Sequence, residues 1–139
     1  MTVLSNSFFC VVVFAMGFVG CSSATLSPNA IQNSQVSFDQ AIDALHSKDY
    51  AGALLLLNEA IAPGGLSADD SAEAYLQRGI CNLELGNLDE GFADIERAEP
   101  GVGDMSRIHM AKHSYWTKQS NPSKAQEELA AANSVREGL

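Results

Sequence analysis

Two histidines in the last third of the sequence have a spacing that metal sites use. His109 and His113 are four residues apart, so on a helix they lie on one face, where two imidazoles can share a metal ion. Asp104 is a nearby candidate for a third ligand, but no spacing fixes it in that role. We expect both imidazoles to have a structural role in helix packing. Metal binding through them is the alternative.

No other part of the sequence indicates catalysis or a cofactor. It contains no nucleophile elbow, phosphate-binding loop, dinucleotide fingerprint or zinc-protease motif. The acids of segment 89–96 lack the glycine and the loop spacing of a calcium-binding EF-hand, so we expect a solvated helix face. They are Asp89, Glu90, Asp94 and Glu96. Cys81 is expected to be a buried, unpaired thiol. The sequence therefore predicts a protein that is not an enzyme.

The composition limits the partners of the chain. Its 139 residues suffice for one modest domain, and their 8 basic and 17 acidic side chains give a net charge of −9. This charge argues against a nucleic-acid surface and against a polybasic contact with anionic lipid. Three cysteines are too few for a disulfide scaffold.

The charges are unevenly distributed along the sequence. Residues 39–104 contain 14 acids and 3 bases, whereas residues 105–139 contain 3 acids and 5 bases. Ordinary solvated surface explains much of this difference. The functional alternative is that the two ends attract different partners, or each other head to tail.

The N-terminal segment is typical of a secretion signal. No charged side chain precedes Asp39, and residues 8–21 contain no strongly polar one. A membrane-spanning helix needs about 20 apolar residues, so this run of fourteen is short for a permanent span and matches a signal-peptide core. We expect residues 1–21 to be a signal peptide. Residues 22–33 are small and polar, and we expect a flexible tether there.

The end of the apolar run resembles the bacterial lipobox. Residues 18–21 read Phe-Val-Gly-Cys, with Phe where the family usually has Leu. The resemblance implies that Cys21 is acylated and becomes the first residue of an exported lipoprotein. Ser22 after it would favour the outer membrane, with the domain facing the periplasm. The alternative is ordinary cleavage after Ala24, which would release a soluble secreted or periplasmic protein.

Three segments of the remaining chain resemble one another. They begin at Asp49, Asn87 and Asn121, residues whose side chains can cap a helix start. A small residue follows four positions later, an aliphatic one after four more and an alanine after three more, which places all three on one helical face. These residues are Ala53, Leu57 and Ala60; Gly91, Ile95 and Ala98; Ala125, Leu129 and Ala132.

Another helical pattern precedes each of these segments. It covers residues 37–46, 72–85 and 105–118, and Pro-Gly breaks at 63–65 and 100–101 separate the pairs. The sequence thus predicts six helices in three hairpins. Since no hairpin can bury its apolar face alone, we expect a stacked array.

This array resembles the tetratricopeptide repeat (TPR), a helix-turn-helix unit with a period of about 34 residues. The second repeat carries the resemblance best. Its matching residues are Tyr75, Gly79, Gly86, Leu88, Gly91, Ile95, Ala98 and Pro100. The third is the weakest, because His109 and His113 stand where an aromatic and a small residue are usual. The resemblance implies an all-α fold, a short TPR-type α-solenoid over residues 34–139, with repeats at about 34–67, 68–103 and 104–137.

In the TPR family an inner groove is lined by positions of each first helix. Carried onto this chain they are Phe38, Ile42 and Leu45; Leu76, Ile80 and Leu83; Met110, Ser114 and Thr117, with Glu73, Glu84, Arg107 and Lys118 at the rim. An apolar groove with an acidic rim suits an amphipathic helix or an extended, partly basic peptide. The alternative for each residue is that it only completes the core.

These expectations combine into an exported, lipid-anchored protein–protein interaction module or assembly factor that binds a partner segment in the groove. The alternative is a homo-oligomeric structural scaffold. The last expected helix, 122–135, is rich in Ala, Gln, Glu and Lys, so it can face water at the end of the array. Otherwise its apolar stripe would be a dimer interface.

Overall fold

The computed structural model describes residues 27–138, which form six helices and no strand. The helices are α1 (Pro28–His46), α2 (Tyr50–Ile61), α3 (Ala68–Leu85), α4 (Leu88–Ala98), α5 (Met105–Lys118) and α6 (Pro122–Glu137). The all-helical fold and the number of helices confirm the prediction. The predicted signal peptide with Cys21, and residues 22–26 of the predicted tether, lie outside the described residues. Of the six helices, none has the length and apolar composition to cross a membrane.

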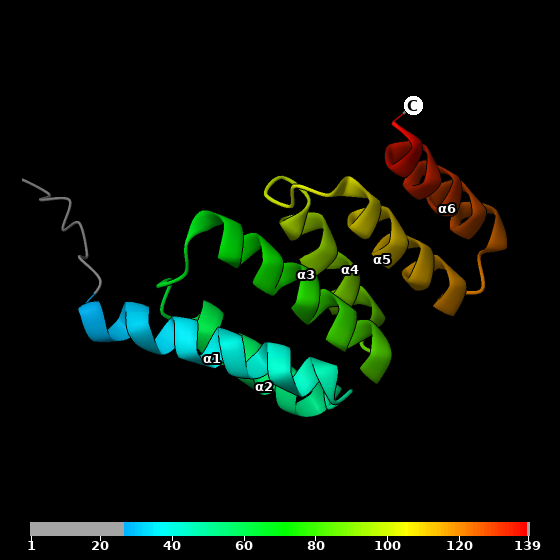
Figure 1. Cartoon of the computed structure of the whole chain (residues 1–139). Coiled ribbons are helices and arrows are strands. Elements are labelled where there is room, and N and C mark those ends of the chain that lie inside the picture. The colour runs from blue at the N-terminus through cyan, green and yellow to red at the C-terminus, as the bar shows by residue number, and fades with distance from the viewer. Residues whose placement is uncertain (1–26, 139) are drawn as a thin grey trace, which may run out of the picture.

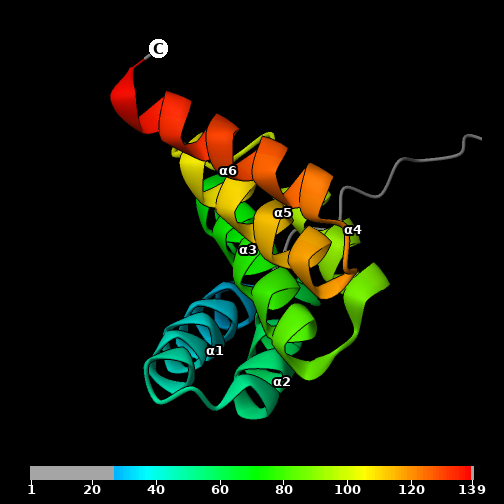
Figure 2. The same cartoon turned by 90° about the vertical axis from the view of Figure 1, so that its right-hand side faces the viewer.

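The helices pack as three consecutive hairpins, α1 with α2, α3 with α4 and α5 with α6 (Figure 1). Helix α3 is central, because it contacts α2 of the preceding hairpin and α5 of the following one as well as α4. Helices α1 and α6 lie at opposite ends of this arrangement in both views (Figures 1 and 2).

The same turn connects the two helices of every hairpin. In each turn a backbone N–H donates at 2.9 Å to the carbonyl five residues earlier, from Asp49 to Ala44, from Asn87 to Asn82 and from Asn121 to Trp116. The residue before each of these donors has the left-handed backbone conformation that ends helices. These residues are Lys48 (φ 59°), Gly86 (φ 87°) and Ser120 (φ 56°).

The predicted helix caps are present, with one difference. The side chains of Asp49 and Asn121 accept hydrogen bonds from the backbone N–H groups of Gly52 (2.9 Å) and Lys124 (3.2 Å). Asn87 makes no such bond.

Helix α1 begins earlier than the sequence led us to expect. Ser27 caps it by accepting a hydrogen bond from Ala30 N, and Pro28 stands in the first turn, where its missing N–H costs nothing. The expectation of a flexible tether through residue 33 is therefore wrong for residues 28–33, which are helical. Ser34, which also precedes the expected helix start at residue 37, is fully buried in α1.

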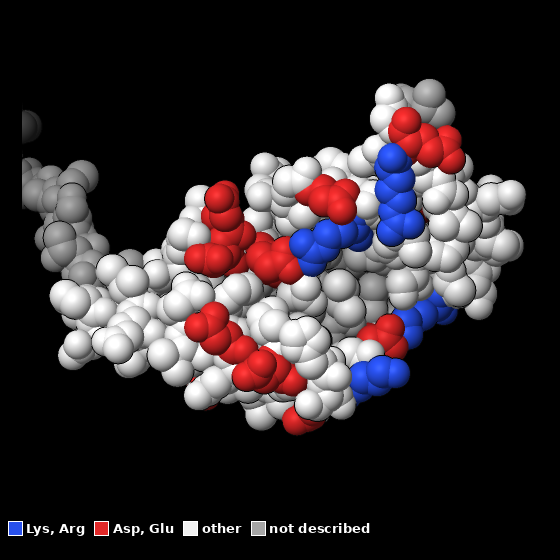
Figure 3. Space-filling view, in the orientation of Figure 1, with Lys and Arg blue, Asp and Glu red and all other residues white. Residues whose placement is uncertain are grey.

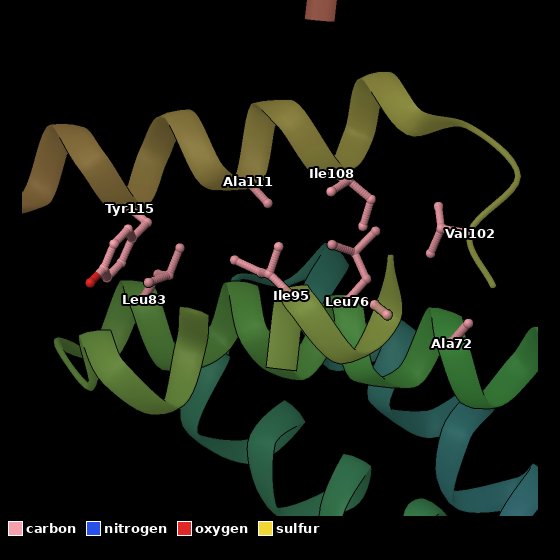
Figure 4. Close-up of a cluster of buried hydrophobic side chains, with 9 residues drawn as sticks. Ala72, Leu76, Leu83, Ile95, Val102, Ile108, Ala111 and Tyr115 are labelled. Carbon is pink, nitrogen blue, oxygen red and sulfur yellow. The ribbon is translucent and has the colours of Figure 1, made fainter. Parts of the chain in front are cut away.

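The buried side chains form two clusters. One lies between α1, α2 and α3 and includes Phe38, Leu57 and Cys81. The other joins α3, α4 and α5 (Figure 4), and there Ile108, Ala111 and Tyr115 of α5 point towards α3 and α4. Its remaining buried members are Ala72, Leu76, Leu83, Ile95, Ala98 and Val102. The second and third hairpins thus share one core.

Candidate functional site

A hollow of about 310 Å³ lies between α3 and α5. Helix α3 contributes Ile80, Leu83 and Glu84; α5 contributes Arg107, Met110, Ala111 and Ser114; the end of α6 contributes Arg136. Six of these eight residues were assigned to the groove or its rim from the sequence. Ala111 and Arg136 were not.

The floor of the hollow is apolar. Ile80 and Met110 are partly exposed, whereas Leu83 is only 1% exposed and contributes little surface. Two other residues assigned to the groove, Leu76 and Phe38, are core residues with exposed fractions of 0% and 7%. Their assignment to an accessible surface is therefore wrong. Core residues and groove residues of a helix pair follow the same apolar pattern. The sequence therefore does not distinguish a buried core position from an exposed groove position.

The groove positions of the first hairpin do not line this hollow. Ile42 and Leu45 are partly buried against the cluster that contains Phe38, so they pack between α1, α2 and α3. Thr117, at the end of α5, lines a different hollow beside α6. The residues of the predicted row that line this hollow thus all belong to the second and third hairpins.

Two ion pairs link α3 to α5 along the hollow. Arg107 donates two hydrogen bonds to the Glu73 carboxylate, Nη1 to Oε2 at 2.7 Å and Nη2 to Oε1 at 2.5 Å. Lys118 Nζ lies 3.3 Å from Glu84 Oε2. In both pairs the partners are 34 residues apart, so they occupy corresponding positions on the two helices. The hydrogen bonds from Arg107 hold the pKa of Glu73 below its ordinary value.

These pairs change the electrostatic character of the rim. We expected an acidic rim from Glu73 and Glu84, but each carboxylate is paired with a basic rim residue. The argument for a partly basic peptide therefore loses its support, because the acids already have cationic partners within the domain. An amphipathic helix remains compatible with the apolar floor.

Arg136 is the charged residue of the hollow that the sequence did not reveal. It makes no ion pair with the described residues. Hydrogen bonds from Ser106 lower the pKa of the Asp104 carboxyl, and the charge of Arg136 adds to this effect. Arg136 reaches the hollow because α6 has 16 residues whereas α4 has 11. The corresponding position of the second hairpin, Val102, lies in a loop, so the repeat pattern offers no signal for it.

The two histidines both contact α6. His109 Nδ1 lies 2.8 Å from Glu128 Oε2, and His113 Nδ1 lies 2.7 Å from the carbonyl oxygen of Ala125. Since a carbonyl only accepts, His113 must donate from Nδ1. Asp104 instead caps α5 by accepting from Ser106 N at 3.0 Å. Among residues 27–138 no group of three or more His, Cys, Asp and Glu side chains is arranged to hold a metal ion. These contacts support the structural role of the histidines.

One of the four acids assigned to a solvated face is buried. Asp94 is 4% exposed and accepts two hydrogen bonds of 2.7 Å from Arg78, a bidentate pair that joins α4 to α3. This pairing raises the pKa of Arg78. The surface assignment of Asp94 is therefore wrong, because a guanidinium on the neighbouring helix neutralises it inside the fold. Asp89, Glu90 and Glu96 are exposed as expected.

The prediction for Cys81 is confirmed. Its side chain is fully buried, and burial raises the thiol pKa to about 11. Because the thiolate is the reactive form, this cysteine is inert near neutral pH.

Searches against protein-family models and curated proteins give no match for this sequence.

Proposed function

We propose that the chain is a short TPR-like interaction module that binds a segment of a partner protein in the hollow between α3 and α5. The observation that carries this proposal is the apolar floor at Ile80 and Met110, framed by two ion pairs that join corresponding positions of neighbouring hairpins. A hollow of this kind accepts an apolar ridge of an amphipathic helix. No catalytic group is part of the proposal.

The three hairpins with identical turns support the repeat assignment. Each turn has the same hydrogen bond to the carbonyl five residues earlier, and cross-hairpin pairs recur at a spacing of 34 residues. Both features are what stacked helix-turn-helix units produce. They are compatible with a TPR-type solenoid.

The proposed cellular location rests on the N-terminal sequence. Acylation at Cys21 would place the start of α1 close to a bacterial membrane, because the six residues from Cys21 to Ser27 span at most about 20 Å. The module would then present its hollow to partners at the cell envelope, as an outer-membrane lipoprotein facing the periplasm. Without acylation the same domain would be secreted or periplasmic.

The binding site is tested by photo-crosslinking in a Gram-negative host that expresses the full chain. A photoreactive phenylalanine replaces Met110 in the hollow, and in the matched control it replaces Glu59, an exposed residue of α2. We expect a discrete crosslinked partner from position 110 and none from position 59. Adding Ile80→Glu should abolish that product while helicity by circular dichroism is kept. Equal products from both positions would contradict the proposal.

The anchor is tested on the same strain by intact mass and membrane fractionation. We expect a mass increment of the size of a diacylglyceryl group that is lost in Cys21→Ser. An unmodified chain that begins near Thr25 would refute the proposed lipid anchor. It would not bear on the proposed binding site between α3 and α5.

A further inference from the structure

Arg136 differs from the other basic residues around the hollow between α3 and α5. Arg107 and Lys118 each pair with a carboxylate of α3, Glu73 and Glu84 respectively. Arg136 lines the same hollow from the last turn of α6, and it makes no ion pair within residues 27–138. Its guanidinium therefore has no contacting carboxylate in the described part of the chain.

Arg136 lies at the end of the hollow where α5 begins. Hydrogen bonds from Ser106 lower the pKa of Asp104, which caps α5, and the charges of Arg107 and Arg136 both add to this effect. The two guanidinium groups are thus close to the same exposed carboxylate. Water screens an interaction with an exposed group that is not in direct contact, so Asp104 neutralises Arg136 only weakly.

The rim carboxylates are not available to Arg136. Both carboxylate oxygens of Glu73 already accept hydrogen bonds from Arg107. Glu84 pairs with Lys118 and lies three helical turns further along α3, about 16 Å away from Glu73. The acids of α3 therefore leave the guanidinium of Arg136 to the solvent.

An occupant of the hollow would change the surroundings of Arg136. A segment seated on Ile80 and Met110 removes water from part of the guanidinium, because the three side chains line one hollow. Loss of water without a new acceptor is unfavourable for a charged donor. A carboxylate compensates this loss best, since it matches the planar fork of a guanidinium with two parallel hydrogen bonds. A basic side chain at this end would instead face Arg107 and Arg136 together.

We propose that the segment bound in this hollow is an amphipathic helix of the partner that carries an acidic side chain one turn from its apolar ridge, and that this carboxylate pairs with Arg136. The apolar ridge contacts Ile80 and Met110. The inference rests on the binding site proposed above and specifies the charge of its ligand. A cation in the last turn also stabilises its own helix, but that role gives no selectivity for the charge of a ligand.

The probe is a labelled alanine-based helical peptide of about 20 residues, with two leucines four positions apart and a glutamate one turn before and one turn after them. Either orientation in the hollow then brings a glutamate to Arg136. The control peptide carries glutamine at both positions, and fluorescence anisotropy with the full chain measures both affinities. We expect the glutamate peptide to bind about threefold more tightly or better, and salt to reduce this difference.

Arg136→Gln should remove the difference between the peptides by weakening the glutamate peptide alone. The matched control is Lys124→Gln, which removes a cation from the same helix outside the hollow and should keep the difference. Ile80→Glu should weaken both peptides, because it places a charge on the apolar floor.

Equal affinities of the two peptides, absence of binding included, would overturn the inference, as would a difference that persists in Arg136→Gln or affinities that Ile80→Glu leaves unchanged. Photo-crosslinking from position 110 tests the binding site separately. A crosslinked product that Arg136→Gln leaves unchanged would keep the binding site and reject the acidic ligand. No product from position 110 would reject the binding site itself.

Discussion

At the residue scale, the crossing of α3 and α4 depends on two glycines. A Cβ atom on Gly79 would lie 2.9 Å from the carbonyl oxygen of Gly91, so the helix backbones meet there without room for a side chain. The equivalent residues one repeat later are His113 and Ala125, and His113 donates a hydrogen bond to the Ala125 carbonyl. In the second hairpin the Gly91 carbonyl leaves no room for a side chain at position 79. In the third hairpin the equivalent carbonyl, that of Ala125, accepts a hydrogen bond from the larger side chain of His113.

Gly79→Ala should destabilise the domain by about 1–3 kcal/mol, because the methyl group forces the two backbones apart. The sign of the change in the free energy of unfolding is informative, because replacing glycine by alanine in an unconstrained helix interior would stabilise the fold by about 1 kcal/mol. Urea unfolding followed by circular dichroism measures the change. The control is Gly103→Ala, where a Cβ has no neighbour within 4 Å and the free energy of unfolding should stay nearly constant. Unchanged or increased stability in Gly79→Ala would contradict the close crossing.

At the scale of the elements, the hairpin turn accounts for most of the resemblance among the three hairpins. Its left-handed residue is glycine only in the second turn, whereas Lys48 and Ser120 occupy the corresponding positions of the other two. A residue with a Cβ is strained in this conformation, because the Cβ approaches its own carbonyl group. The turn is therefore imposed by helix packing in the first and third hairpins.

Lys48→Gly and Ser120→Gly should each stabilise the domain by about 0.5–1 kcal/mol, because they relieve this strain at an exposed position. The reciprocal change, Gly86→Ala, should destabilise by a similar amount. Thermal unfolding of the three variants tests the sign. Gln40→Gly, in the middle of α1, is the control and should cost about 1 kcal/mol. Destabilisation by either substitution in the turn would show that the left-handed conformation is not retained in solution.

At the scale of the whole molecule, the uneven charge of the sequence is largely used inside the fold. The acid-rich region and the C-terminal region meet where α5 packs on the second hairpin. Three ion pairs cross that interface: Arg107–Glu73, Lys112–Glu99 and Lys118–Glu84. On the face in Figure 3, the acidic side chains over α1 have no basic neighbour, whereas those over the beginning of α3 adjoin a basic side chain. The remaining basic side chains lie towards the other half of this face, beside acidic ones. The asymmetry thus specifies how the hairpins stack.

Glu73→Gln should lower the free energy of unfolding at pH 7 by about 0.5–1 kcal/mol, a modest loss because both partners are partly exposed. Since the folded-state pKa of Glu73 lies below its unfolded value, the pair stabilises the fold above the unfolded pKa. This stabilisation is lost as the pH falls through the folded pKa. The difference in stability between the variant and the parent should therefore shrink as the pH is lowered past the ordinary carboxyl pKa of about 4.3. Urea unfolding at pH 7 and pH 3 measures this, with Glu59→Gln as the exposed control. An equal loss at both pH values would exclude the ion pair as its cause.

The local features of the fold could be read from the sequence. Helix caps, Pro-Gly breaks and apolar spacing are properties of residues that are close in the sequence. The caps at Asp49 and Asn121, together with the breaks and the spacing, therefore predicted six helices and most of their boundaries to within a few residues. The start of α1 was missed because residues 28–33 have no apolar periodicity, although Ser27 and Pro28 are a capping signal. The burial of Cys81 followed from the same helical pattern.

Only the tertiary structure decided which surfaces are accessible and how the charges are paired. Leu129 follows the same pattern as Leu57 and Ile95, yet it is exposed because no helix among the described residues packs on it. Arg136 reaches the hollow through the extra length of α6, and the rim carboxylates are neutralised by residues one repeat further along the chain. Burial and ion pairing depend on which elements meet in space. A repeat pattern specifies the kind of contact, and the packing of neighbouring hairpins determines where that contact is made.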